Sequence, residues 1–190
     1  TSATVTKLGD GTLTLSGTNG YTGGTTISAG TLSISTDLNL GAVPTSTTAN
    51  SITLSGGVLQ ATGAATLDAK RGITMTADSG FAATSGNTLT INGVIDGAYV
   101  ITVNGANQTG TVKFAGTNTY TGATTVSAGT LLITNGSGLG ATSAGTIVAS
   151  GATLDLYNVT VGAEAIILNG GTLADATSSL AGDVTLTANS

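Results

Sequence analysis

A segment of 24 residues occurs twice in this chain, and its second copy follows the first at a constant offset of 99 residues. The first copy is GTLTLSGTNGYTGGTTISAGTLSI at residues 11–34, and the second is GTVKFAGTNTYTGATTVSAGTLLI at residues 110–133. The copies match at 16 of 24 positions, and most mismatches are conservative, such as Ile27 against Val126. Internal repetition constrains the architecture first, because repeats of one supersecondary unit bury their apolar faces by stacking on one another.

Within each copy, short stretches of alternating apolar and polar residues indicate β-strands. Leu13 and Leu15 share one face of such a stretch, while Thr12 and Thr14 occupy the other. Small-residue corners such as Gly30 separate the strands and bend the chain without room for a hairpin or a crossover helix. The 40 Thr and 30 Gly residues fit many short strands joined by Gly-rich turns.

Strands of this kind suit a sandwich, a barrel or a solenoid, and three features favour the solenoid. The repeat is long and internal, the corners are too short for crossover helices, and the aliphatic residues are spread evenly with only six aromatics. We therefore predict a right-handed parallel β-helix over residues 1–190, all-β with essentially no helix. At about 20 residues per rung it would have roughly eight to nine rungs.

The alternation also predicts which side chains face the core. Equivalent residues of the two copies should point the same way, so 99 residues should be close to four or five whole rungs, with Tyr21 and Tyr120 on the same side. Leu132 replaces Ser33 and should lie outside. The residues expected to point inward are Leu13, Leu15, Ile27, Leu32, Ile34, Val112, Phe114, Val126, Leu131 and Ile133.

The two copies resemble the passenger-associated strand repeat of bacterial autotransporters. Both contain a Gly-Thr-Leu-type strand, a Gly-x-Asn-x-Tyr-x-Gly turn, and a Thr-Thr-Val-x-x-Gly-Thr-Leu-type pair of strands. The resemblance implies a secreted segment of a longer surface adhesin, which would also have an N-terminal signal and a C-terminal outer-membrane barrel outside this chain. The motif residues to which it gives a structural role are Asn19, Tyr21, Gly23, Gly30, Asn118, Tyr120, Gly122 and Gly129.

Composition argues against several functions. Four basic residues and a net charge of −5 cannot form a phosphate-binding surface, so nucleic acid is not an expected partner. The absence of Cys and His removes thiolate and imidazole metal ligands and the Ser-His triad, and we expect no cofactor. No apolar run approaches the roughly 20 residues of a membrane-spanning helix, so we expect no membrane insertion by this segment.

Two other functions remain as alternatives. A β-helical polysaccharide lyase or glycoside hydrolase would need two carboxyl groups about 5 to 10 Å apart, whereas the acidic residues are scattered, mostly at predicted turns. Asp68, Lys70 and Arg71 form the most charge-dense stretch, which is interpreted as a polar loop. The acidic residues are Asp10, Asp37, Asp68, Asp78, Asp96, Asp155, Glu164, Asp175 and Asp183.

An ice- or surface-binding solenoid would need Thr-x-Thr once per rung on one face, and the observed spacings fit no single rung length. The pairs are Thr4/Thr6, Thr12/Thr14, Thr74/Thr76, Thr88/Thr90 and Thr185/Thr187. An exposed Tyr21 or Tyr120 could stack on a sugar, but each ring is expected to cover its own turn, while Asn19 and Asn118 bond backbone amides there.

The sequence thus favours a structural, non-enzymatic stalk of a surface-displayed adhesin. Such a stalk can fold rung by rung as it emerges from the outer membrane, because its contacts are between near neighbours. The expected partners are a host-cell or bacterial surface protein or glycan. The exposed strand edges at the two ends also predict end-to-end self-association.

Overall fold

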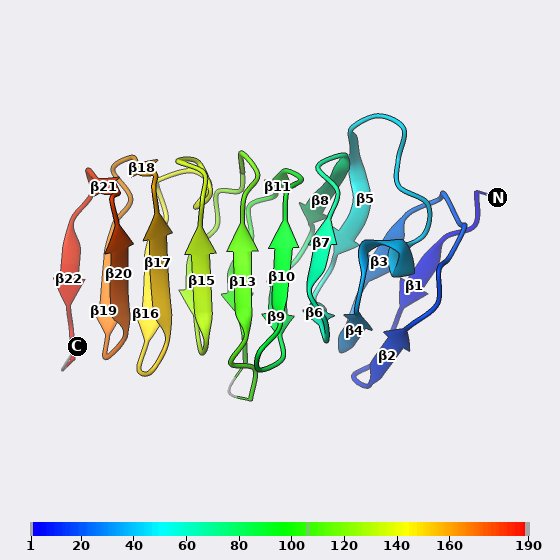
Figure 1. The fold of residues 1–190 in the computed structure, drawn as a ribbon, viewed down its shortest axis with the longest axis horizontal. Helices are drawn as coiled ribbons and strands as arrows, with labels where there is room; N and C mark the ends of the chain where they lie inside the picture. Colours follow the sequence, from blue (N-terminus) through cyan, green and yellow to red (C-terminus); the bar gives the residue numbers. More distant parts are fainter. Residues whose placement is uncertain (1, 106, 189–190) are drawn as a thin grey trace.

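The computed structural model describes residues 2–105 and 107–188, which form one right-handed parallel β-helix (Figure 1). Every pair of named strands is parallel, and the chain visits three sides of the rod in a constant order. Nine strands stack in the longest sheet, which gives eight coil-to-coil steps, so the predicted fold and its eight to nine rungs are confirmed.

The strands belong to three long sheets, each named here after its first strand in chain order. The β1 sheet contains β1 (Val5–Lys7), β3 (Thr25–Ile27), β5 (Thr48–Leu54), β8 (Arg71–Met75) and β11 (Ile95–Asp96). The β2 sheet contains β2 (Thr12–Leu15), β4 (Thr31–Ile34), β6 (Val58–Ala61), β9 (Ser79–Ala83), β12 (Ile101–Val103), β14 (Thr124–Val126), β16 (Thr146–Ala149), β19 (Ile166–Asn169) and β22 (Val184–Leu186). The β7 sheet contains β7 (Ala65–Leu67), β10 (Thr88–Ile91), β13 (Thr111–Phe114), β15 (Thr130–Ile133), β17 (Thr153–Tyr157) and β20 (Thr172–Ala176). In addition, β18 (Thr160–Val161) pairs with β21 (Ser179–Leu180), beyond β11 along the upper edge in Figure 1.

The two sequence repeats lie on different sides of the rod. In the β2 sheet, Thr12 and Thr102 are four coils apart through successive register partners, so these coils take 90 residues. The remaining nine residues carry the chain from β12 to Thr111 in the β7 sheet. The offset of 99 residues is therefore four coils plus one side, and the prediction that it is a whole number of rungs is wrong.

Variable coil length is the reason for this error. One coil takes 19 residues between Thr12 and Thr31, but the next takes 27 residues, up to Val58. As a result, β2 lies in the β2 sheet while its counterpart β13 lies in the β7 sheet. Tyr21 follows β2 and Tyr120 follows β13, so the two rings do not project from the same side.

The core consists of inward-facing apolar columns, mostly aliphatic, that run along the rod. Eight of the ten residues predicted to face inward are fully buried, which confirms the alternation. Leu13 is 37% exposed and Leu15 is half-buried, because β2 is the first strand of its sheet and one side of each residue lacks a neighbouring coil. Leu132 lies on the outer face and is partly exposed, as predicted. One inward column of the β2 sheet contains Leu13, Leu32, Leu59, Phe81, Val103, Val126, Val148, Leu168 and Leu186.

The longest coil contains the most irregular segment. A single 3-10 turn, η1 (Asp37–Leu40), precedes a loop that bulges from the rod before β5 (Figure 1), and the described ranges contain no α-helix. Arg71 begins β8, is only 2% exposed, and places its Nε 2.7 Å from Asp37 Oδ1. The interpretation of this stretch as a polar loop was therefore wrong for Arg71, which anchors the base of the bulging loop.

Candidate functional site

The Asn residues of the repeat motif connect neighbouring coils. Asn118 is buried; its Oδ1 accepts a hydrogen bond from Ile95 N at 3.0 Å in the preceding coil, and its Nδ2 donates to Gly138 O at 2.7 Å in the following one. Asn19 donates to Gly17 O and, across the coil boundary, to Asn39 O at 2.8 Å. We expected bonds within the local turn, whereas the main contacts join successive coils.

The motif tyrosines are held in the structure by a bond to the next strand. Tyr120 is fully buried, and its hydroxyl lies 2.8 Å from Thr124 Oγ1. Tyr21 is partly exposed and makes the same contact with Thr25 Oγ1 at 2.8 Å. Burial raises the pKa of both phenols, Tyr120 more strongly, so both are neutral at physiological pH. Tyr120 therefore has no exposed ring face for a sugar.

The motif glycines lie where a neighbouring backbone comes too close for a side chain. A Cβ on Gly122 would collide with the carbonyl group of Tyr99, and one on Gly23 would lie 2.7 Å from Ala3 O. Gly30 and Gly129 have positive φ angles of 62° and 58°, which favour glycine. The contacts of Asn19, Asn118, Gly23 and Gly122 thus involve the backbone of neighbouring coils.

The burial of one carboxyl group, that of Glu164, was not predicted from the sequence. Glu164 is 1% exposed; its Oε1 accepts a hydrogen bond from Thr146 Oγ1 at 2.7 Å, while its Oε2 has no hydrogen-bond partner among the described residues. Burial raises the pKa of this carboxyl group. Corners lack the alternation that marks strands, so the sequence offered no signal for its burial.

The bulging loop covers a cavity of about 430 Å³ that Arg71 lines together with Tyr21 and Pro44. The guanidinium donates to Asp37 Oδ1, Leu40 O and Gly41 O, so its charge is compensated by the loop base. The arrangement stabilises the loop and leaves little of the cation for a ligand.

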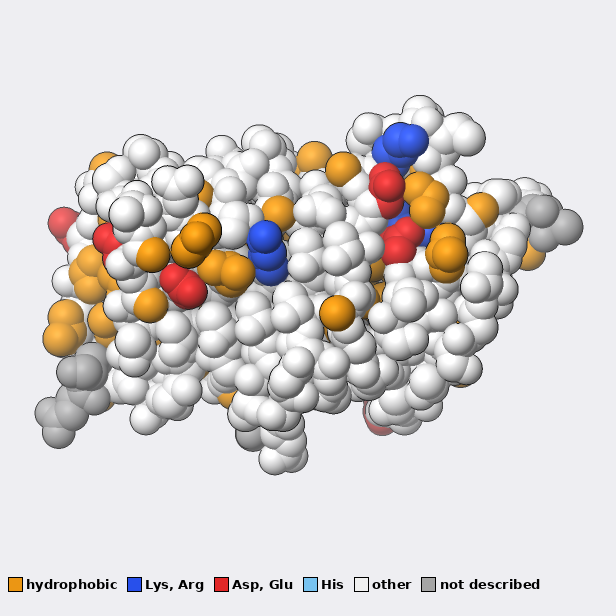
Figure 2. Space-filling model, viewed as in Figure 1, with side chains coloured by type: hydrophobic (Ala, Val, Ile, Leu, Met, Phe, Trp, Pro, Cys, Tyr) orange, Lys and Arg blue, Asp and Glu red, His pale blue; other side chains and the backbone are white. Residues whose placement is uncertain are grey.

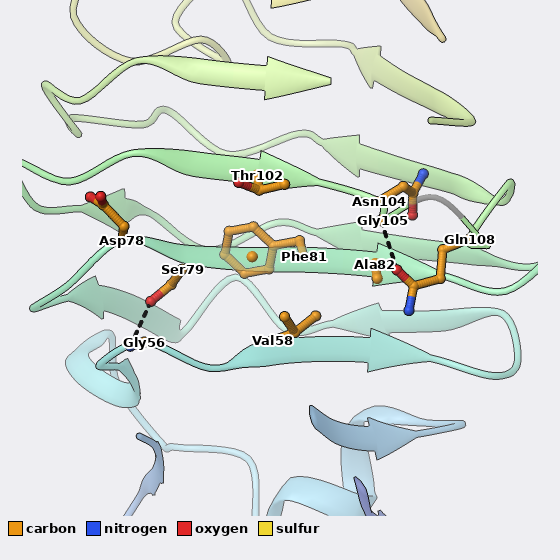
Figure 3. A pocket seen from close by; sticks show the side chains of 11 residues that line it. Gly56, Val58, Asp78, Ser79, Phe81, Ala82, Thr102, Asn104, Gly105 and Gln108 are labelled. Carbon is orange, nitrogen blue, oxygen red and sulfur yellow. Dashed lines mark hydrogen bonds between the residues drawn. The ribbon is translucent and has the colours of Figure 1, made fainter. Parts of the chain in front are cut away.

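A second concave surface of about 310 Å³ lies on the outer face of the β2 sheet (Figure 3). It forms where Gly80 and Ala82 of β9 replace larger outward residues, between Val58 of β6 and Thr102 of β12. Asp78 stands at one end of this groove, and Gln108, whose Oε1 accepts from Gly105 N at 2.7 Å, stands at the other. With a single carboxylate and no cation among its lining residues, the groove suits hydrogen bonding of a small neutral group.

Threonine ladders are present, but they do not form a Thr-x-Thr array. The five Thr-x-Thr pairs are spread over all three sheets, since β2 and β22, β8, and β10 lie on different sides. The β7 sheet has one continuous outward Thr column, yet the neighbouring column contains Lys113, Leu132 and Asp155. This column consists of Thr88, Thr111, Thr130, Thr153 and Thr172.

Comparison with known proteins connects this geometry to a family. The model of the passenger-associated-transport-repeat matches residues 5–34 and 106–133, which include the whole of both copies of the motif. The adhesin BmaC autotransporter of Brucella suis biovar 1 (strain 1330) is 38% identical over 129 residues, which are 67% of this chain and 4% of that protein. The chain thus spans a small part of this relative's length, and no solved structure matches it.

Within residues 2–105 and 107–188, no helix is long and apolar enough to cross a membrane. The matched repeats, the similarity to an adhesin autotransporter and the parallel β-helix together support an autotransporter passenger repeat domain.

Proposed function

We propose that this chain is a structural stalk segment of a secreted, surface-displayed autotransporter adhesin and has no catalytic role. The observation that carries the proposal is the inward apolar column, which runs without interruption through nine stacked strands. Eight steps of about 4.8 Å give a rod about 40 Å long. A rod of this kind holds more distal parts of a passenger away from the cell.

The name of the BmaC relative supports a surface target for the whole protein, because that relative is an adhesin. By extension, we propose a host-cell or bacterial surface protein or glycan as the partner of the full-length protein. The stalk segment contributes reach and presentation, and the hydrogen bonds that Asn19 and Asn118 make to neighbouring coils support this role.

The same architecture supports a role in export. Each coil bonds mainly to the coils before and after it, so folding can proceed coil by coil on the outer surface, and folded coils cannot slide back. The test replaces the inward pair Leu131 and Ile133 with Asp in the full-length protein and measures surface display by antibody labelling of intact cells. Display should fall strongly, because both side chains are fully buried.

A matched control replaces the outward neighbours Thr130 and Leu132 with Asp. It adds the same two charges to the same strand, and display should stay near the wild-type level. Undiminished display of the inward variant, together with failure of the purified inward-variant chain to fold, would contradict folding-driven export.

The ends of the rod support the proposal of end-to-end association. Within the described ranges, the outer edges of β2 and β22 are unpaired, and the inward residues Leu13 and Leu186 are 37% and 62% exposed. These residues belong to one column, so a further coil or a second copy can continue it. Sedimentation should therefore show growing oligomers as the concentration of the purified chain rises.

A further inference from the structure

The outer face of the β7 sheet contains a short column of one basic, one apolar and one acidic side chain. Lys113, Leu132 and Asp155 are register partners on β13, β15 and β17, so they lie at the same height on three adjacent strands. Each points outward, because its strand neighbours Val112, Leu131 and Leu154 are buried in the core. A leucine thus lies midway between one cation and one anion.

Both charges of this column are free to meet a partner. Neither Lys113 nor Asp155 has a side-chain hydrogen bond or an ion pair within the described residues, and the ion pair found there joins Arg71 and Asp37. In Figure 2, basic, hydrophobic and acidic side chains follow one another across the visible face over β13, β15 and β17. Tyr157 belongs to the same strand as Asp155, two residues further on, and is 57% exposed.

The column is not required by the repeat. The equivalent positions of the first copy and the next coil, Thr14, Ser33 and Gln60, are uncharged and also stack as register partners. The solenoid therefore forms with uncharged polar residues at these positions, so the charges and the leucine of the Lys113–Leu132–Asp155 column are not needed for folding. A partly exposed leucine between opposite charges, beside the exposed Tyr157, offers charge complementarity to a partner with the reverse order of charges.

The order of the three residues is self-complementary. A two-fold axis that runs along β15 in the plane of the interface exchanges β13 with β17 and keeps the height along the strand. It places Leu132 on Leu132 of a second copy, and Lys113 on Asp155 at both ends of the column. We propose that this face, formed by Lys113, Leu132, Asp155 and Tyr157, binds a second copy of the chain, side by side and with the rod axes antiparallel.

Symmetry favours a second copy over an unrelated partner, because the isologous contact uses each charge once and leaves none unpaired. The surrounding Thr column is nearly uniform, so two such faces can approach to about 10 Å, the usual separation of packed sheets. The patch is smaller than a standard interface, so the isolated chains should associate weakly and reversibly.

Charge reversal gives a decisive experiment on the 190-residue chain, with the dimer dissociation constant measured by sedimentation equilibrium. Lys113→Glu and Asp155→Lys should each weaken self-association by about tenfold or more, because each creates two like-charge contacts across the axis. An equimolar mixture of the two variants should form a heterodimer, since both of its contacts again join opposite charges. The double variant should likewise recover the wild-type affinity.

Controls separate this face from the ends and from misfolding. Lys70→Glu makes the same charge change in the exposed turn after β7, outside the column formed by Lys113, Leu132 and Asp155, and should leave the affinity unchanged. Leu132→Ser reproduces the residue of the first copy and should weaken the dimer without lowering the melting temperature. High salt should weaken this dimer, whereas end-to-end chains held by apolar strand edges should persist.

Failure of the two folded single variants to combine would overturn the proposal, as would a wild-type chain that shows no two-fold dimer at millimolar concentration. Rescue by mixing cannot arise from a stability defect, because each variant would retain its own defect. Oligomers that grow without limit and ignore Lys113→Glu would assign self-association to the ends alone.

Discussion

Arg71 and Glu164 are two of the buried ionisable side chains, which also include Lys7 and Tyr120, and they differ in how their charge is compensated. Arg71 has a carboxylate partner in Asp37, so its charge is compensated. Glu164 has only the Thr146 hydroxyl, and its second oxygen has no partner in the described part of the chain. An ionised carboxylate at this position would be costly, so folding favours the protonated form.

Glu164 should therefore make the stability of the C-terminal coils depend on pH. Burial raises the pKa of its carboxyl group in the folded chain, so its protonated form stabilises fully below the unfolded pKa, and this stabilisation is lost as pH rises through the folded pKa. Glu164→Gln keeps the shape and removes the titration. Melting temperatures from about pH 4, near the usual Glu pKa, up to neutral pH should fall more in the wild type than in the variant. Parallel curves would show that Glu164 ionises without cost.

Close backbone contacts make a second prediction about single residues. Gly122→Ala should lower the free energy of unfolding by about 1–3 kcal/mol, because its Cβ would meet the carbonyl group of Tyr99. Gly20→Ala in the other copy is the control, since nothing lies within 4 Å of a Cβ there. Urea unfolding monitored by circular dichroism measures both. Equal losses would mean that loss of backbone freedom, not the close contact, determines the effect.

At the scale of the strand, alternation predicted which side chains are buried. The pattern worked for β15 and β13 because both faces are defined by strict period-two spacing and each strand has neighbours on both sides. It failed for Leu13 because burial also depends on a covering coil, which β2 lacks on one side. It had no information on Arg71 at the start of β8 or on Glu164 in a corner, both of which are buried by tertiary contacts.

Adjacent leucines of β15 offer a matched test of this alternation. Leu131→Asp should cost several kcal/mol of unfolding free energy, because it places an unpaired charge in the core. Leu132→Asp, one residue further along and on the outer face, should stay within about 0.5 kcal/mol of the wild type. Urea denaturation of both variants measures the difference, and similar losses would contradict the assigned orientation.

For the whole molecule, the sequence predicted a parallel β-helix and its approximate number of rungs, but it could not predict how the repeats align. Alignment depends on the length of every intervening coil, and loops such as the one before β5 lengthen a coil without disturbing the strands. The motif tolerates its displacement from one side of the rod to the next, because its contacts involve only one coil and that coil's neighbours. The groove beside Gly80 was also missed, since it arises from residues on three strands that are far apart in sequence.

A rod in which each coil contacts only its neighbours should open from its ends. Its stability is approximately a sum of coil and interface contributions, so the outermost coils, with one neighbour each, open at the lowest free energy. Amide hydrogen exchange should therefore be fast in β2 and β22, slower inward, and slowest in β9, β12 and β14, which have strands on both sides. The bulging loop between η1 and β5 should exchange quickly despite its position between coils, because its backbone makes few hydrogen bonds. Exchange at one common rate across all strands would show instead that the rod unfolds as a single cooperative unit, which would also remove the basis for coil-by-coil folding during export.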